Sequence, residues 1–242
     1  MTWTLLLERL VPQASTYARH LDWLFEGIFW VVGFWFVLTV IMFFWLMFRF
    51  RKREGVAAEY YDGSEWKLKR WVTIPHLLVL VCDIFIIVGA VKVWYEIKQF
   101  LPPAQQTVRV ISQQWAWTFV HPGADGQIDT ADDIASVDEL HVQTGVTYHF
   151  KLESRDVLHS FSIPVFRLKQ DAIPGRVITG WFEPTKTGTY DLQCTEICGI
   201  GHALMPGRIF VEDHDNHQTW MKSAAPVAAV GAAPAPATGG TK

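Results

Sequence analysis

A cluster of metal-binding residue types lies near the C-terminal end of the chain, in the segment CTEICGIGHALM at positions 194–205. It contains Cys194 and Cys198, followed by His202 and Met205. Thiolate and thioether sulfurs are soft donors, which favour copper over calcium or magnesium. Zinc sites use Cys, His and carboxylates and rarely a thioether, so Met205 is the residue that points to copper.

Three other interpretations of this cluster are open. A disulfide between Cys194 and Cys198 would close a very short loop and demand unusual geometry. A structural zinc site would want a second, regularly spaced pair of Cys or His residues, which is missing. The third is a turn without any ligand. A copper site also needs a further histidine, and His159 is the candidate because a neighbouring loop of a sandwich can approach from upstream.

The composition is typical of a membrane-associated chain. Of the 242 residues 50% are hydrophobic, and the chain holds 12 Trp and 16 Phe. The formal net charge of −3 provides no basic field for nucleic acid, and no nucleic-acid-binding motif occurs, so we expect no nucleic-acid partner. The apolar stretch at the N-terminus is too short for a signal peptide, so export would depend on internal apolar segments.

Two long apolar segments predict a transmembrane helical hairpin. Residues 27–48 carry no charge and, as a helix, are long enough to cross the hydrocarbon core. Residues 71–91 are nearly as apolar, and Trp71, Trp94 and Tyr95 at or just beyond the ends are of the type enriched at membrane interfaces. Asp83 lies near the middle of this second segment, where an ionisable residue implies either a function or a hydrogen-bonded contact with a partner.

The connection between the two apolar segments sets the expected orientation. It is rich in cations: Arg49, Arg51, Lys52, Arg53, Lys67, Lys69 and Arg70. Cytoplasmic loops carry an excess of Lys and Arg, so this loop is expected in the cytoplasm and both termini on the outer side.

From Thr107 onward the pattern changes to short β-branched runs bounded by turn residues, which predicts an all-β sandwich or barrel. The expected organisation is an outer N-terminal segment at 1–26, a transmembrane hairpin at 27–98 with a cytoplasmic loop at about 49–70, and an extracytoplasmic β domain at 99–222. Residues 223–242 form a low-complexity Ala/Pro-rich tail that is expected to be disordered.

A hairpin followed by a β domain with QQWAW, DVLHSFSIP, LKQDAIPGR and CTEICGIGHALMPG resembles cytochrome c oxidase subunit II. The similarity runs from about the first apolar segment to Val211. It implies a two-helix transmembrane hairpin plus an all-β cupredoxin-like sandwich that holds two copper ions as a dinuclear Cu-A centre. The implied ligands are His159, Cys194, Glu196, Cys198, His202 and Met205.

The resemblance also assigns individual roles within this set. Cys194 and Cys198 would bridge the two coppers, and His159 and His202 would each bind one of them. Met205 would be a weak ligand of one copper. The main-chain carbonyl of Glu196 would bind the other copper, while its side chain would bind a Mg or Mn ion shared with the catalytic subunit.

Outside the ligand set, the resemblance implies a path for electrons. Trp115 would receive the electron from cytochrome c, and Gln114 and Asp156 match docking positions. Trp117 is expected to pack near the copper loops instead. Acidic residues of the 121–140 stretch are further docking candidates: Asp125, Asp129, Asp132, Asp133, Asp138 and Glu139. The chain lacks C-x-x-C-H and so carries no attached haem of its own.

The function implied is that of the electron-receiving subunit of a terminal cytochrome c oxidase. It would take electrons from cytochrome c, or from a cytochrome c domain of another subunit, and pass them to haem in catalytic subunit I, where oxygen is reduced to water. The implied location is a bacterial inner membrane, crossed twice, with the Cu-A domain and both termini on the periplasmic side.

Two alternatives differ in the residues they require. A membrane-anchored copper-binding or copper-delivery protein would bind one copper reversibly through two cysteines and a histidine. It would not need Met205, Glu196 and Trp115 together. Subunit II of a quinol oxidase would share the hairpin and the sandwich but lack the copper ligands, all of which occur in this sequence.

Overall fold

The computed structural model describes residues 6–57, 60, 62–224 and 226. It divides into two compact units, one made of residues 1–7 and 20–96 and the other of residues 8–19 and 97–242. Apart from residues 223, 224 and 226, the expected disordered tail lies outside the described residues, as do the first five residues of the chain.

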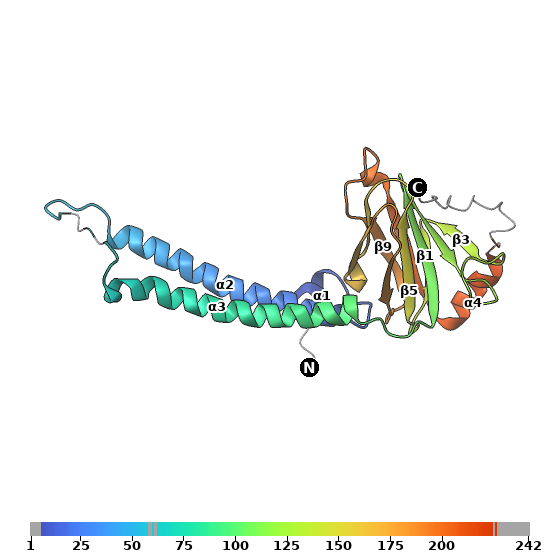
Figure 1. Cartoon of the computed structure of the whole chain (residues 1–242), viewed down its shortest axis with the longest axis horizontal. Coiled ribbons are helices and arrows are strands. Elements are labelled where there is room, and N and C mark those ends of the chain that lie inside the picture. The colour runs from blue at the N-terminus through green and yellow to red at the C-terminus, as the bar shows by residue number, and fades with distance from the viewer. Residues whose placement is uncertain (1–5, 58–59, 61, 225, 227–242) are drawn as a thin grey trace, which may run out of the picture. The chain divides into compact units, whose positions relative to one another are not determined.

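The first unit is a pair of long helices, α2 (Ala18–Arg49) and α3 (Trp66–Trp94), preceded by the short helix α1 (Leu6–Leu10). Figure 1 shows α2 and α3 as two long helices joined by the connection between residues 49 and 66. A π-helical turn at Tyr95–Gln99 follows α3. Both helices are long and apolar enough to cross a membrane, with mean hydropathies of 2.4 and 2.5 in their most apolar windows. None of either window is buried by the rest of the chain, so these side chains are available to lipid or to a partner. The expected hairpin is confirmed.

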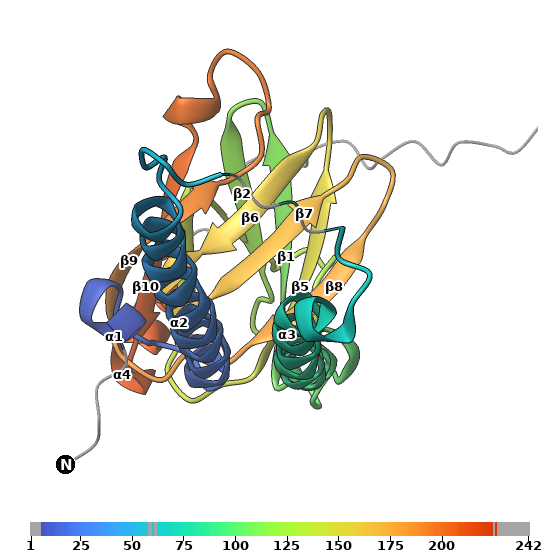
Figure 2. The ribbon, with the colours of Figure 1, turned by 90° about the vertical axis from the view of Figure 1, so that its left-hand side faces the viewer.

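The second unit is a sandwich of two five-stranded sheets (Figure 2). The first sheet has the order β3-β2-β1-β5-β8 and the second the order β4-β10-β9-β6-β7. The strands are β1 (Gln106–Gln113), β2 (Ala116–His121), β3 (Ile134–Val137), β4 (Glu139–Gln143), β5 (Tyr148–Ser154), β6 (His159–Ile163), β7 (Leu168–Ala172), β8 (Ile178–Phe182), β9 (Gly188–Cys194) and β10 (Pro206–Glu212). Strands β1 and β5 pair in parallel, as do β4 and β10, and the other pairs are antiparallel.

Three short elements complete the sandwich. They are the 3-10 turns η2 (Pro164–Phe166) and η3 (His202–Leu204) and the C-terminal helix α4 (His214–Ser223). The side chain of Asp213 caps α4 by accepting a hydrogen bond from the backbone N–H of Asn216, which satisfies a donor that the first helical turn leaves free.

The core lies between the two sheets and follows the two-residue period of the strands. On β2 every second side chain is buried, beginning with Trp117 and Phe119. Phe161 from the opposite sheet packs against both of these rings and against Phe150. Gly180 has to be small, because a Cβ atom there would lie 2.2 Å from the Phe150 ring. The expected β-sandwich is confirmed.

Candidate metal centre

The sandwich brings together two segments that are far apart in the sequence. Strand β6 begins at His159 and strand β9 ends at Cys194. The two strands pair antiparallel with Phe161 opposite Cys194, so the start of one lies beside the end of the other. The remaining candidate ligands are in the loop that connects β9 to β10. Strand register therefore places the upstream histidine next to the cysteine loop.

The candidate side-chain donors form a continuous row of contacts. Nδ1 of His159 lies 3.9 Å from Sγ of Cys194, which lies 3.8 Å from Sγ of Cys198. Sγ of Cys198 in turn lies 3.5 Å from Nδ1 of His202 and 3.9 Å from Sδ of Met205. The two thiols are at the middle of the row and one imidazole lies beside each of them.

Glu196 reaches this row through its main chain. Its carbonyl oxygen lies 3.3 Å from Sγ of Cys194, whose thiol donates a hydrogen bond to it. Its half-buried side chain makes no hydrogen bond or ion pair with any other described residue. The carbonyl and the carboxylate of Glu196 are thus available for two different contacts.

The shape of the row distinguishes between kinds of site. Within the described part of the chain, one group has ligand atoms that all lie within 4.8 Å of one another, and it is His159, Cys194 and Cys198 without His202. A tetrahedral zinc site needs four donors around one point. Two central thiols with a separate imidazole at each end do not have that shape. Both cysteines are free thiols, so the structure does not contain the alternative disulfide.

Burial keeps the thiol of Cys198 protonated when no metal is bound. Burial, together with the nearby Cys194, raises the pKa of Cys198 to about 11. Metal binding requires the thiolate, so an ion that binds must displace protons. His159, Cys198 and Met205 are almost completely buried, so a bound ion would be enclosed by protein with little room for an exchangeable ligand.

Asp156 holds His159 in the form that a metal ligand needs. One oxygen of its carboxylate lies 2.8 Å from Nε2 of His159, and the other accepts a hydrogen bond from the backbone N–H of Gln114. Partial burial opposes ionisation of Asp156, but the hydrogen bonds from His159 and from two backbone N–H groups outweigh it and lower the pKa of this carboxyl. A carboxylate at Nε2 keeps the proton on that nitrogen, which leaves Nδ1 free to face Cys194. Sequence reasoning assigned Asp156 to docking and missed this contact, although the spacing D-x-x-H was a possible signal.

An Asp156→Asn substitution is expected to weaken copper binding by roughly 10–100-fold, the usual cost of losing a hydrogen-bond partner of a metal-ligating histidine. Competition with a chelator of known affinity measures this change. Asp191→Asn is the matched control, because Asp191 forms an exposed ion pair with Arg208. Equal affinities for the two variants would show that Asp156 does not support His159.

Trp115 and Gln114 are attached to the loop that carries the candidate ligands. Nε1 of Trp115 and Nε2 of Gln114 both donate hydrogen bonds to the carbonyl oxygen of Cys198, at 3.3 and 2.8 Å. The Trp115 indole is 36% exposed and also packs on Gly201, where a Cβ atom would lie 2.3 Å from the ring. Sequence reasoning missed the need for glycine at position 201. The indole therefore connects the protein surface to the loop that carries the candidate ligands.

Trp117 does not reach the surface as Trp115 does, which is as expected. It is fully buried and its ring packs edge-on against His159, with centroids 6.3 Å apart, and against Phe161. It forms part of the wall behind the candidate centre.

Several carboxylates of the 121–140 stretch have partners within the domain. Asp129 pairs with Arg109, and Asp133 is buried and accepts hydrogen bonds from the backbone of Asp129 and Thr130. Asp138 accepts a hydrogen bond from the backbone N–H of Trp117. These three side chains stabilise the loop, which leaves fewer charges for a docking role than the sequence implied.

The comparisons with known proteins agree on one family. Residues 106–213 match the family model described as cytochrome c oxidase subunit II, periplasmic domain. The chain is 31% identical to the alternative cytochrome c oxidase subunit 2 of Bradyrhizobium diazoefficiens, over 80% of this chain and 76% of that protein. It is 26% identical to cytochrome c oxidase subunit 2 of Cereibacter sphaeroides, over 88% of this chain and 78% of that protein.

Among solved structures, the chain is similar to the crystal structure of the periplasmic domain of subunit II of cytochrome oxidase (CoxB) of Bradyrhizobium japonicum. The TM-score is 0.46 and the identity 31%, and the match covers 52% of this chain and 96% of that one.

Proposed function

The chain belongs to the cytochrome c oxidase subunit II family, and we propose that it is the electron-receiving subunit of a terminal oxidase. In this proposal it accepts electrons from cytochrome c, or from a cytochrome c domain of another subunit. It then passes them to haem in catalytic subunit I, where oxygen is reduced to water.

The observation that carries the proposal is the contact between Trp115 and the metal-binding loop. An exposed indole whose N–H bonds to the carbonyl of Cys198 offers a donor protein a short route to the buried sulfurs. Gln114 fixes the same carbonyl and keeps the loop and the indole together. A copper-delivery protein would need no such aromatic group at its metal loop.

The donor set fits a dinuclear copper centre. Cys194 and Cys198 would hold both ions, and His159 and His202 would each bind one. Met205 and the carbonyl of Glu196 would complete the two coordination shells. Held by these two cysteines, a copper pair would supply a redox site that takes up and releases one electron with little change in geometry. Because the ligands come from the protein, the site favours electron transfer over substrate binding.

The buried surroundings of the site suit this role. His159 is held by Asp156 and by the ring of Trp117, so its orientation is fixed before a metal arrives. A ligand set that is already in place lowers the cost of reorganisation on each change of redox state.

We further propose that Glu196 and the surface around it face the catalytic subunit. The side chain of Glu196 has no partner among the described residues, so it can contribute to a Mg or Mn site completed by that subunit. Three large apolar side chains on the same loop are strongly exposed: Ile197, Ile200 and Leu204. Exposed apolar side chains gathered on one loop are typical of a protein–protein contact.

The proposed location follows from the hairpin. The chain is a membrane protein with two apolar helices, and the cationic loop between them favours a cytoplasmic position. Both termini and the copper domain would then lie on the periplasmic side of a bacterial inner membrane, within reach of a soluble or tethered cytochrome c.

The test of this function is a rapid-mixing experiment on the copper-loaded whole chain in detergent. Reduced cytochrome c should be oxidised in step with bleaching of the copper absorption, and the copper should stay bound. Release of copper to a metal-free acceptor protein, with no oxidation of cytochrome c, would favour copper delivery instead.

A further inference from the structure

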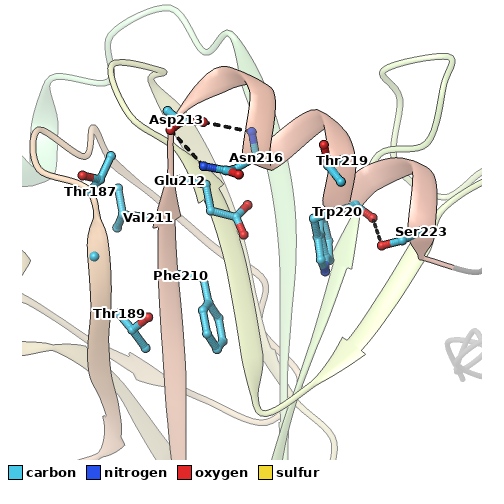
Figure 3. Close-up of a pocket in the computed structure, with 11 residues that line it drawn as sticks. Thr187, Thr189, Phe210, Val211, Glu212, Asp213, Asn216, Thr219, Trp220 and Ser223 are labelled. Carbon is cyan, nitrogen blue, oxygen red and sulfur yellow. Dashed lines mark hydrogen bonds between the residues drawn. The ribbon is translucent and has the colours of Figure 1, made fainter.

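A second group of buried histidines lies on the sandwich, under the C-terminal helix α4. Its members are His121 of β2, His141 of β4, Glu212 of β10, and His217 and Trp220 of α4. The three histidines are only 2%, 7% and 2% exposed. Figure 3 shows Trp220 on α4 and Phe210 and Glu212 on the strand below it, as lining residues of one pocket. In Figure 1, α4 lies toward the other end of the sandwich from the loop that contains η3, so this group is separate from the candidate metal centre.

One carboxylate joins the helix to the sheet. Oε1 of Glu212 lies 3.0 Å from Nδ1 of His141 on the sheet, and Oε2 lies 3.1 Å from Nδ1 of His217 on the helix. The imidazole of His141 is stacked between two aromatic rings: Phe210 at 4.5 Å and Trp220 at 4.2 Å, each at 8°. The attachment of α4 therefore depends on buried imidazole rings and on the one carboxylate between them.

His121 is the histidine of this cluster for which no described residue offsets the positive charge of a protonated ring. Trp220 covers it edge-on, with centroids 4.9 Å apart, and its Nε2 is buried with no hydrogen-bond partner among the described residues. A proton added to this ring would place a positive charge in a dry site next to two further imidazoles. Burial first, and then the neighbouring His141 and His217, hold the pKa of His121 at about 3. Burial likewise lowers the pKa of His217, despite its bond to Glu212.

The other charged groups around the cluster do not offset a positive charge on His121. Glu139 lies 3.9 Å from Nε2 of His141, and Glu212 pairs with His141 and His217. The buried hydroxyl of Tyr148 accepts a hydrogen bond from the backbone N–H of Gln143, and His214 on α4 contacts the side chain of that same glutamine. Both nearby carboxylates are thus committed to other histidines.

We propose that this cluster is a proton-sensitive latch, in which α4 stays on the sandwich while His121 and His217 are neutral and leaves it when they are protonated in mildly acidic medium. When α4 leaves, His121 and His217 reach water and bind protons with their ordinary pKa of about 6.5. The released form then carries more protons below that pH. The attachment is accordingly strongest above about pH 6.5 and weakens progressively as the pH falls toward 3.

A metal ion is a poorer occupant for this cluster. The indole of Trp220 is in ring contact with all three imidazoles. In the described part of the chain, the donor group that meets the compact geometry of a metal site is the one at Cys194, not this one.

Hydrogen–deuterium exchange on the whole chain in detergent, at pH 7.5 and pH 5.0, tests the latch once labelling times are corrected for intrinsic exchange. For a histidine that titrates near 6.5 when released and near 3 when docked, the opening equilibrium of residues 214–223 should rise roughly 30-fold at pH 5.0. The strand β1 serves as an internal reference and should keep its protection. His214→Gln is the matched control on the same helix and should retain the full pH response.

His121→Phe keeps an aromatic ring under Trp220 but cannot be protonated, so the response should shrink to a few-fold. Equal protection of α4 at pH 7.5 and pH 5.0 in the wild-type chain would overturn the latch. A pH response of wild-type size in His121→Phe would overturn it as well. Trp220→Ala provides a second variant, which keeps all three histidines but removes the indole that covers His121. It should leave α4 poorly protected at both pH values, whereas a wild-type pH response in this variant would contradict the proposal.

Discussion

A Cys198→Ser chain is expected to lose its copper and its colour, and the oxidase that contains it is expected to lose turnover with reduced cytochrome c. Cys198 is in the middle of the donor row, because its Sγ contacts Cys194, His202 and Met205. A serine hydroxyl is a hard donor with a very high pKa, so it cannot replace a shared thiolate. The loss of affinity should exceed the roughly 10–100-fold expected for removing a group that only supports a ligand.

Metal analysis and the visible spectrum of the purified chain measure this effect. Cys82→Ser is the matched control, because Cys82 is a free cysteine on α3, outside the β domain. That variant should bind copper normally. Undiminished copper binding by Cys198→Ser would show that the central thiol is not a ligand.

Replacing Trp115 with leucine is expected to leave the copper in place but slow its reduction by cytochrome c by about 100-fold, equivalent to about 2.7 kcal/mol in the barrier. The indole is the exposed group that bonds to the carbonyl of Cys198, and leucine provides neither the ring nor the N–H donor. Trp115→Phe keeps an aromatic ring but lacks the N–H donor, so its rate of copper reduction should lie between those of the wild-type chain and Trp115→Leu. Stopped-flow oxidation of reduced cytochrome c gives the rates.

A Gly201→Ala substitution separates the position of the indole from its chemistry. The new Cβ atom would lie 2.3 Å from the Trp115 ring, so the ring must leave the loop while the tryptophan itself is unchanged. The rate should fall as it does in Trp115→Leu. Gly33→Ala is the control, since a Cβ atom there meets nothing within 4 Å. Normal rates in both Trp115→Leu and Gly201→Ala would show that electrons reach the centre elsewhere.

Features encoded over short stretches of sequence could be predicted well. The uncharged run of residues 27–48 lies within the observed helix α2. The alternation along residues 107–120 corresponds to strands β1 and β2. The donors of the 194–205 segment were recognisable because a single loop holds them at fixed spacing. Helix length, strand period and ligand spacing are local properties.

Contacts that depend on tertiary structure could not be predicted in the same way. The resemblance paired His159 with the cysteine loop, but the carboxylate behind His159 and the space that Gly201 leaves for Trp115 emerge only once β6 and β9 are side by side. The histidine cluster under α4 was missed entirely. Its members come from three strands and one helix, and single histidines on β2 and β4 carry no signal by themselves.

The central claim is that one chain holds two copper ions that share an electron through Cys194 and Cys198. Copper analysis combined with electron paramagnetic resonance of the copper-loaded whole chain tests it most directly. The account predicts two copper ions per chain and a hyperfine pattern from one electron shared equally between two copper nuclei. One copper per chain, with the spectrum of an isolated copper ion, would contradict it.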